Sequence, residues 1–158
     1  MSQTTEYFAH EAAAIISENE GCRLTPYVDS RGYETIGYGH CLDPRVGGGI
    51  TQQQANYLLK TDVAEKLARL RDHIEFWDEL PNFARVVLID MAFQMGVADV
   101  LRFRRTLVYM EDRNWHRAST ELLDSNYASE EQTPHRARRN SQRLAQQKVY
   151  LGDNGGEK

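Results

Sequence analysis

Glu20, Asp29 and Thr35 are the residues whose types and spacing suggest chemistry. Glu20 and Asp29 are nine residues apart, and Thr35 follows six residues after Asp29. Cleavage of a glycosidic bond needs two carboxyl groups, one to protonate the leaving oxygen and one opposite to assist a water molecule. A threonine hydroxyl could position that water. Acids near helix ends and in turns are also common without any function, so the spacing alone leaves both interpretations open.

Local patterns place these residues on a helix, a turn and a strand. Apolar residues at helical spacing predict a helix from about residue 4 to 19, and Gly21 is suited to end it in a left-handed conformation. Glu20 in the last turn opposes the helix dipole, which favours cations there, so stability does not explain this acid. The turn-forming cluster 29–32 predicts a hairpin, with residues 33–38 as its return strand.

The remaining patterns predict a mostly helical chain. The segment DPRVGGG, residues 43–49, is expected to be a loop, and Thr51 is expected to cap a long helix. An apolar segment that ends at Gly96 predicts the central core helix. Two further helices are expected near 103–112 and 115–124, and Thr133 with Pro134 marks the start of a basic last helix.

These elements predict one domain over residues 1–158 with two lobes. A hairpin lobe is expected at about 20–50, a linking helix at about 51–72, and a helical lobe at about 73–150. The N-terminal helix is expected to pack with the helical lobe.

Composition narrows the class of protein. The chain has 158 residues, of which 41% are hydrophobic and 27% charged, as is ordinary for a globular protein. The net charge of −4 gives no basic field for nucleic acid. The sequence contains no apolar run of about 18 residues, so we expect no membrane-spanning helix. Residues 1–20 lack the pattern of a signal peptide, and we therefore expect a cytoplasmic protein. Cys22 and Cys41 are too few for a disulfide framework, although a single bridge between them stays open.

Four segments resemble one known family. The string EGCRLTPYVDSRGYETIGYGH, residues 20–40, is similar to the signature of the phage-type lysozymes, or endolysins, of the T-even lysozyme group. The resemblance continues in family order with ITQQQANYLLKTDV, AFQMG and QTPHRARR, so it covers nearly the whole chain. The segment between His40 and Ile50 is shorter than in the T-even prototype.

The resemblance implies a fold, a reaction and a substrate. The family fold is α+β and lysozyme-like, with a small N-terminal β-hairpin lobe and a larger helical C-terminal lobe joined by a long helix. By resemblance, Glu20 is the general acid, and Asp29 and Thr35 hold the attacking water in an inverting hydrolysis. The expected substrate is the glycan strand of peptidoglycan, cut between N-acetylmuramic acid and N-acetylglucosamine. No cofactor and no metal are implied.

Other residues are assigned by the resemblance one at a time. His40 and Asp62 match a structural ion pair near the site. Phe93 and Gln94 match residues at the floor of the substrate cleft, and Arg136 matches an arginine that contacts the catalytic glutamate. We therefore expect Phe93, Gln94 and Arg136 to bind substrate.

Rival functions remain at this stage. A lytic transglycosylase would keep Glu20 but form an anhydro product without water, whereas Asp29 and Thr35 favour hydrolysis. A non-catalytic module that binds the bacterial wall would be marked by loss of Glu20, which is present. By family analogy we expect a monomeric endolysin that a holin releases from the host cytoplasm to the periplasmic wall. A virion component or a secreted bacterial effector stays open.

Overall fold

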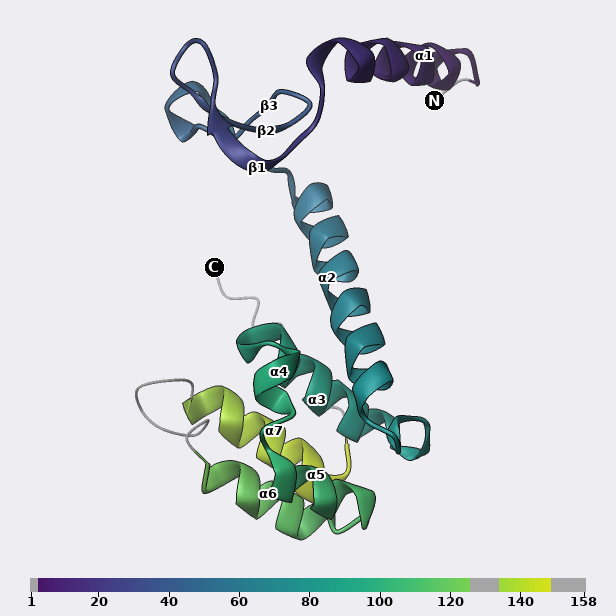
Figure 1. Ribbon diagram of the computed structural model, residues 1–158, viewed down its shortest axis with the longest axis vertical. Helices are drawn as coiled ribbons and strands as arrows, with labels where there is room; N and C mark the ends of the chain where they lie inside the picture. The colour runs from purple at the N-terminus through teal and green to yellow at the C-terminus, as the bar shows by residue number, and fades with distance from the viewer. Residues whose placement is uncertain (1–2, 126–133, 149–158) are drawn as a thin grey trace, which may run out of the picture. The chain divides into compact units, whose positions relative to one another are not determined.

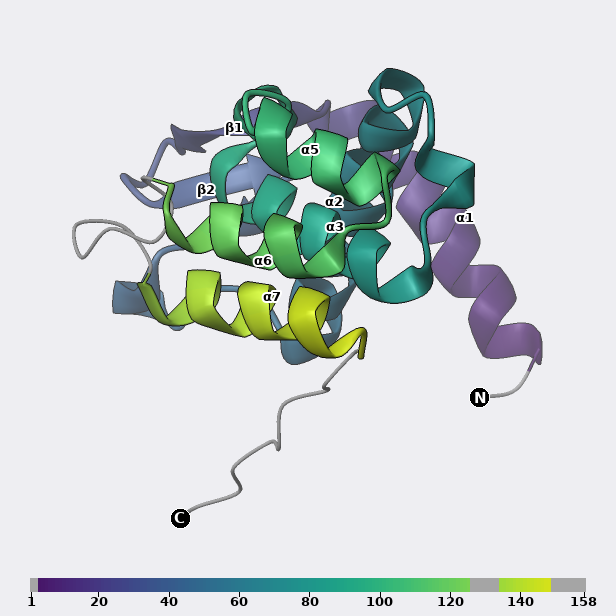
Figure 2. The same cartoon turned by 90° about the horizontal axis from the view of Figure 1, so that it is seen from below.

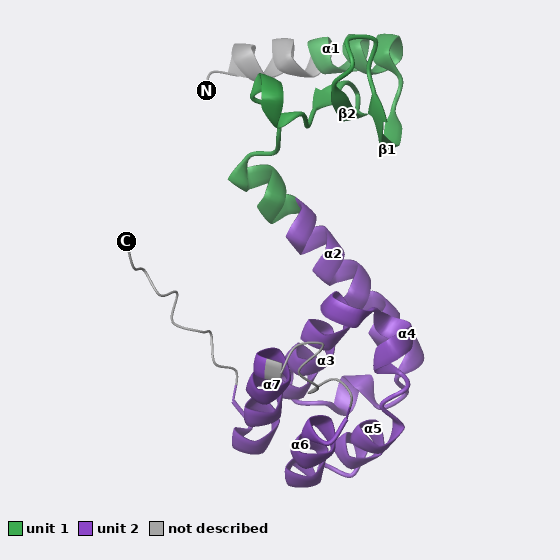
Figure 3. Ribbon diagram, turned by 90° about the vertical axis from the view of Figure 1, so that its left-hand side faces the viewer, with its two compact units in different colours: residues 1–57 green, residues 58–158 purple. Residues whose placement is uncertain are grey.

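The structure, a computed structural model, describes residues 3–125 and 134–148, with side chains from residue 12 onward (Figure 1). The chain forms two compact units, Met1–Tyr57 and Leu58–Lys158 (Figure 3). The boundary falls inside α2 (Gln52–His73), the predicted long helix. A small sheet in the first unit and a helical second unit confirm the α+β class. Packing of the N-terminal helix with the helical lobe stays a prediction.

The first unit contains the predicted helix and hairpin. Helix α1 (Gln3–Glu20) ends at Gly21, which has the left-handed φ of 64° that was expected of it. Strands β1 (Arg23–Val28) and β2 (Glu34–Gly37) are antiparallel, and β3 (His40–Cys41) pairs with the other side of β2. The hairpin prediction is confirmed. The two-residue β3 was not predicted, because it is too short to show an alternating pattern.

Strand β2 lies at the centre of this sheet, and the edge strand β1 is irregular. Thr35 pairs with Tyr27 on one side and with Cys41 on the other. The register of β1 is interrupted between Arg23 and Tyr27, a segment that contains Pro26. Proline has no N–H for the ladder, which explains an irregular pairing at that point.

The predicted loop 43–49 contains a short 3-10 helix, η1 (Pro44–Val46). The Asp43 side chain caps it by accepting a hydrogen bond from the Arg45 backbone N–H, and Pro44 at the first position suits the start of a helix. Gly48 follows so closely that a methyl group built on it would lie 2.6 Å from the backbone N and O of Asp43. Only glycine fits there, so the loop is tightly folded.

Thr51 caps helix α2, as predicted. The Thr51 hydroxyl accepts a hydrogen bond from Gln54 N at 3.2 Å, and Thr51 N donates to Gln54 Oε1 at 2.8 Å. This reciprocal arrangement is a capping box, which satisfies two backbone donors at the helix start.

The second unit is helical. Besides the end of α2 it contains η2 (Trp77–Glu79), α3 (Asn82–Met95), α4 (Val97–Val100), α5 (Arg104–Glu111), α6 (Trp115–Leu123) and α7 (Pro134–Gln146). The predicted helices at α3, α5, α6 and α7 are confirmed, while α4 and η2 were not predicted. Helix α6 lies beside both α5 and α7, and α7 also contacts α3 (Figures 1 and 2). The predicted cap at Thr133 lies outside the described residues.

The core of the second unit forms around α3. This helix buries Ala84, Val87, Leu88, Met91 and Ala92, which confirms it as the central core helix. Leu70, Met110, Leu122 and Leu144, from four other helices, are also fully buried. Trp77 is 3% exposed, and Trp115 packs edge-on against Phe83 with ring centroids 5.0 Å apart. Both tryptophans therefore serve packing. Within the described residues, no helix combines the length and apolar character needed to cross a membrane.

Replacing Leu144 with alanine should destabilise the protein by about 2–5 kcal/mol, because the change removes three carbon atoms from a fully buried site and leaves a cavity. Leu123→Ala on α6 is the matched control, since Leu123 is 42% exposed and should cost less than about 1 kcal/mol. Urea unfolding followed by circular dichroism gives both values. Equal losses for the two variants would contradict the position of the core.

Candidate active site

Glu20 lies at the junction of α1 with the sheet. It is the last residue of α1 and is exposed, and the left-handed Gly21 turns the chain away directly after it. A methyl group built on Gly39, between β2 and β3, would lie 3.9 Å from Glu20 Oε2. The carboxyl group therefore stands next to backbone of the sheet that bears no side chain, at a glycine with a left-handed φ of 81°.

Asp29 is held by the turn that it begins. Its Oδ1 accepts hydrogen bonds from Arg31 N at 2.8 Å and Tyr33 N at 2.9 Å. Its backbone N donates to Tyr33 O at 2.9 Å, and its backbone O accepts from Gly32 N at 3.0 Å. Both side-chain bonds use Oδ1, while Oδ2 lies 3.8 Å from Arg31 Nε, beyond hydrogen-bond range. The turn thus fixes the carboxylate through Oδ1, while Oδ2 faces the Arg31 side chain without a hydrogen bond to it.

These contacts favour the ionised form of Asp29. The backbone N–H of Tyr33 is the largest cause that lowers the pKa of this carboxyl below its usual value. Partial burial opposes that effect, but the Arg31 N–H, the Arg31 charge and the Gly32 N–H add to the lowering. Asp29 is therefore a carboxylate at neutral pH, the form that can accept a proton from water.

Thr35 is joined to Asp29 through the backbone of Tyr33. The Thr35 side chain is buried, with 3% exposure, and its hydroxyl donates to Tyr33 O at 3.1 Å. Tyr33 O also accepts from Asp29 N, so one peptide oxygen links the two candidate residues. Because its hydrogen is used by Tyr33 O, the Thr35 oxygen is left as an acceptor. The Tyr33 carbonyl thus connects Asp29 with Thr35, a contact that the sequence did not predict. A joint role of the two residues stays a prediction.

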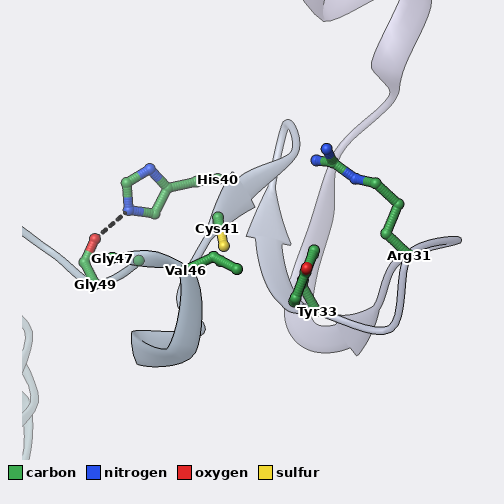
Figure 4. A pocket seen from close by; sticks show the side chains of 8 residues that line it. Arg31, Tyr33, His40, Cys41, Val46, Gly47 and Gly49 are labelled. Carbon is green, nitrogen blue, oxygen red and sulfur yellow. Dashed lines mark hydrogen bonds between the residues drawn. The ribbon is translucent and has the colours of Figure 1, made fainter.

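A hollow of about 520 Å³ lies beside the Asp29 turn, between the hairpin and loop 43–49 (Figure 4). Arg31 and Tyr33 form one wall, and Cys41, Val46 and Gly47–Gly49 form the other. The Arg31 guanidinium lies 5.7 Å from the centre of the Tyr33 ring, within cation–π range. Arg31 and Tyr33 were not predicted as site residues, although they follow Asp29 by only two and four residues.

His40 contacts the loop through one ring nitrogen. His40 Nε2 lies 2.8 Å from Gly49 O, which requires the proton on Nε2 (Figure 4). Asp62, its predicted partner, belongs to α2 in the other compact unit. The ion pair between them stays a prediction. Cys22 and Cys41 are free thiols in this structure, Cys22 exposed and Cys41 half-buried.

The predicted substrate-binding residues Phe93, Gln94 and Arg136 all lie in the second unit. Phe93 and Gln94 are adjacent near the end of α3, with Phe93 40% exposed. Arg136, on α7, makes a two-pronged contact with Asp90 on α3: Nε to Oδ2 at 2.9 Å and Nη2 to Oδ1 at 2.6 Å. The fully buried Asn140 adds a third hydrogen bond to Asp90 at 2.7 Å. A contact of Arg136 with Glu20 would lie between the two units, so it stays a prediction.

Asp90 was missed in the sequence. Burial alone would raise the pKa of its carboxyl, but hydrogen bonds from Arg136 and Asn140 and the charges of Arg136 and Arg143 lower it instead. One signal was present, because Asp90 is the single acid within the apolar segment NFARVVLIDMAFQM. Its partners lie 46 and 50 residues further along the chain, however, and no local pattern connects them.

Across residues 3–125 and 134–148, no three side chains of His, Cys, Asp or Glu come together as metal ligands would.

Known proteins share this sequence pattern. Residues 17–143 match the sequence profile of the family described as phage lysozyme. The chain is 31% identical over 138 residues to the pre-baseplate central spike protein Gp5 of Enterobacteria phage T4, a match that covers 72% of this chain but only 24% of that protein. It is 27% identical over 151 residues to probable T4-type lysozyme 1 of Dictyostelium discoideum, covering 79% and 88% of the two chains. It is also 35% identical over 69 residues to an endolysin of Acyrthosiphon pisum secondary endosymbiont phage 1, covering 44% and 47%.

The Asp90 contact should make stability depend on pH. The pKa of Asp90 is depressed in the folded state, so its contribution is fully present above the unfolded pKa and is lost as pH falls through the folded pKa. Asp90→Asn should cost about 1–3 kcal/mol at pH 7, because it removes the charge facing Arg136, and the difference from wild type should shrink towards pH 3. Urea midpoints across that range test this. Asp99→Asn, which removes an exposed ion pair with Arg102, is the control, and its urea midpoints should follow those of wild type across the pH range. If the difference in midpoint between Asp90→Asn and wild type is the same at every pH, Asp90 does not link stability to pH.

Proposed function

The chain belongs to the phage lysozyme family, and from this premise we propose that it is a muramidase that hydrolyses the β-1,4 bond between N-acetylmuramic acid and N-acetylglucosamine in peptidoglycan. The observation that carries the proposal is the turn in which the Tyr33 backbone holds both Asp29 and Thr35. That turn supplies the ionised carboxylate of Asp29 and the hydroxyl oxygen of Thr35, which can accept a hydrogen bond from water. Glu20, on a separate element and next to open backbone at Gly39, supplies the second carboxyl group.

We assign the three roles by the resemblance to the family, and the hydrogen bonds of Asp29 and Thr35 are compatible with them. Glu20 donates a proton to the oxygen of the leaving sugar. A water molecule donates one hydrogen to Asp29 Oδ2 and the other to the Thr35 oxygen, whose own hydrogen is already directed to Tyr33 O. With both hydrogens held, a lone pair of the water is directed at the anomeric carbon, and Asp29 takes the proton as the bond forms.

This assignment implies inversion at the anomeric carbon. A water between Asp29 and the sugar needs a separation of about 6.5–9.5 Å between the two carboxyl groups, against about 5–5.5 Å when the second carboxylate attacks the sugar itself. We propose the first arrangement because Asp29 is bound within its turn by two backbone amides, which restrict its approach to the sugar. Phe93, Gln94 and Arg136 are proposed to contact the glycan, with His40 and Asp62 in a structural role.

The rival activities account for fewer residues. A lytic transglycosylase would use Glu20 but needs no water, and so gives no role to the linked pair of Asp29 and Thr35. A non-catalytic module that only binds the wall needs none of the three.

For the biological setting we propose a monomeric endolysin. A holin would release it from the host cytoplasm, and it would cause lysis by cutting the periplasmic wall. The likeness to part of a phage spike protein favours a second candidate, the same hydrolysis performed as part of a virion. Detection of the chain in purified particles by mass spectrometry would favour the virion role. Its presence only in infected cells would favour the endolysin.

Glu20→Gln should lower lysis of outer-membrane-permeabilised Gram-negative cells by about 10²- to 10⁴-fold, because the amide keeps the shape but cannot donate the proton. The fold should be unchanged by circular dichroism, since Glu20 is exposed. Glu18→Gln, an exposed change on the same helix, is the matched control and should lyse cells at the wild-type rate. Retention of more than about a tenth of the activity by Glu20→Gln would remove it from the role of general acid.

The stereochemistry of the product should be inverted. Proton NMR of soluble peptidoglycan immediately after cleavage should show the α anomer first, because water attacks the face opposite the leaving oxygen. An initial β anomer would indicate that Asp29 attacks the sugar. Signals of 1,6-anhydromuramic acid would indicate a transglycosylase.

A further inference from the structure

Arg45 connects the loop after β3 to the turn that holds Asp29. Arg45 Nε lies 2.9 Å and 3.0 Å from the two carboxylate oxygens of Asp43, and Nη2 also contacts Asp43 Oδ2. The same Nη2 donates to Gly32 O at 3.0 Å, thirteen residues back along the chain. One guanidinium therefore bridges a carboxylate in loop 43–49 and a carbonyl in turn 29–32.

The Asp43 end of this bridge is firmly anchored. Asp43 is buried, with 3% exposure, and its backbone O accepts from Gly48 N at 2.8 Å. Gly48 packs against it so closely that no side chain fits, and the neighbouring Leu42 N donates to Glu34 O on β2 at 2.7 Å. Arg45 lowers the pKa of Asp43 to about 2, so this end of the bridge stays charged at any pH at which the protein works. A buried, charged and tightly packed anchor fixes where the guanidinium can reach.

The other end of the bridge lies on the peptide group that binds Asp29. Gly32 O and Tyr33 N belong to the same planar peptide unit. Arg45 binds the oxygen of this unit, and the N–H of the unit donates to Asp29 Oδ1 at 2.9 Å. The Arg45 guanidinium also lies 5.8 Å from the centre of the Tyr33 ring. Chains of hydrogen bonds polarise one another, so a charged donor on the oxygen strengthens the bond that the N–H makes.

We propose that Arg45 is a positioning residue for Asp29, which it holds in place by fixing the peptide group between Gly32 and Tyr33. The consequence for catalysis rests on the proposed function, in which Asp29 takes the proton from water. Arg45 itself is placed to touch neither the water nor the sugar. Loop 43–49 would thus support catalysis through Arg45, although it contributes no catalytic group.

The bridge should also affect the pKa of Asp29, through the Tyr33 N–H. The Tyr33 N–H is the largest cause of the lowered pKa of Asp29, and Arg45 orients that N–H. Among the described residues, Arg31 is the charged side chain paired with Asp29, while Asp43 and Glu34 are the acids that act on Arg45. Without Arg45, the Tyr33 N–H bond should weaken and the pKa of Asp29 should rise towards its ordinary value. Activity on acidification should then begin to fail at a higher pH.

Two variants separate positioning from stability. Arg45→Lys keeps the positive charge beside Asp43, but a single ammonium cannot span the carboxylate and Gly32 O as the planar guanidinium does. The double variant Arg45→Ala with Asp43→Asn removes the bridge without leaving an unpaired buried charge, which would itself destabilise the loop. Arg102→Ala, which removes an exposed ion pair with Asp99 in the second unit, is the control.

The measurements are the pH midpoint of the Asp29 carboxyl ¹³C signal, taken without substrate, and the kcat and KM for soluble peptidoglycan. Both bridge variants should move the midpoint to higher pH and lower kcat by about 10-fold or more with KM unchanged, because small displacements of a catalytic group are costly. Arg45→Lys should do so with a melting temperature close to that of wild type. Arg102→Ala should leave the midpoint and kcat as they are.

Several results would overturn the proposal. A wild-type midpoint in both bridge variants shows that Arg45 does not hold Asp29. Lower melting temperatures with unchanged midpoint and kcat show that Arg45 is only structural, and a moved midpoint with unchanged kcat excludes a part in catalysis. Full recovery of both values by Arg45→Lys shows that charge suffices without the bridge. If wild type cleaves no peptidoglycan, the proposed function fails, and the midpoint alone then decides whether Arg45 positions Asp29.

Discussion

The hydrogen bond from Tyr33 N to Asp29 Oδ1 is the contact on which the candidate site depends. It closes the turn between β1 and β2, it is the largest cause that keeps Asp29 ionised, and it belongs to the residue whose carbonyl also receives the Thr35 hydroxyl. A backbone donor suits this task better than a side chain, because its position is set by the sheet and loses no rotamer freedom on ordering. The site is therefore as rigid as the hairpin that bears it.

The two carboxyl groups are given different surroundings by the fold. Asp29 receives two backbone amides and faces an arginine, all of which stabilise negative charge. Glu20 is the last residue of a helix and is exposed, with no such donors described around it. Enzymes that use paired carboxyl groups commonly divide the roles of acid and base by such a contrast of environments. Here both environments follow from secondary structure, a helix end and a turn, within a single compact unit.

Sequence reasoning succeeded where the relevant information was local. The end of α1 at Gly21, the turn at Asp29, the cap at Thr51 and the apolar helix before Gly96 all follow from residues within one or two turns. It missed contacts between distant segments, such as Asp90 with Arg136 and Arg45 with Gly32, because two residues far apart in the chain show no common pattern until the fold places them together. The two-residue β3 was missed for the opposite reason, since so short a strand has no periodicity. The roles of Glu20, Asp29 and Thr35 were assigned by family resemblance. The spacing of such common residue types could not have assigned them.

The edge strands of the small sheet have a consequence for how the protein behaves at high concentration. A strand at the edge of a sheet presents unpaired N–H and C=O groups, which can recruit strands from other molecules. One edge of this sheet is only two residues long, and the other contains Pro26 and a break in register. Neither edge offers the long, flat row of donors and acceptors that edge-to-edge aggregation requires. The hairpin unit can thus leave glycine-rich backbone open for a ligand while offering a poor template for self-association.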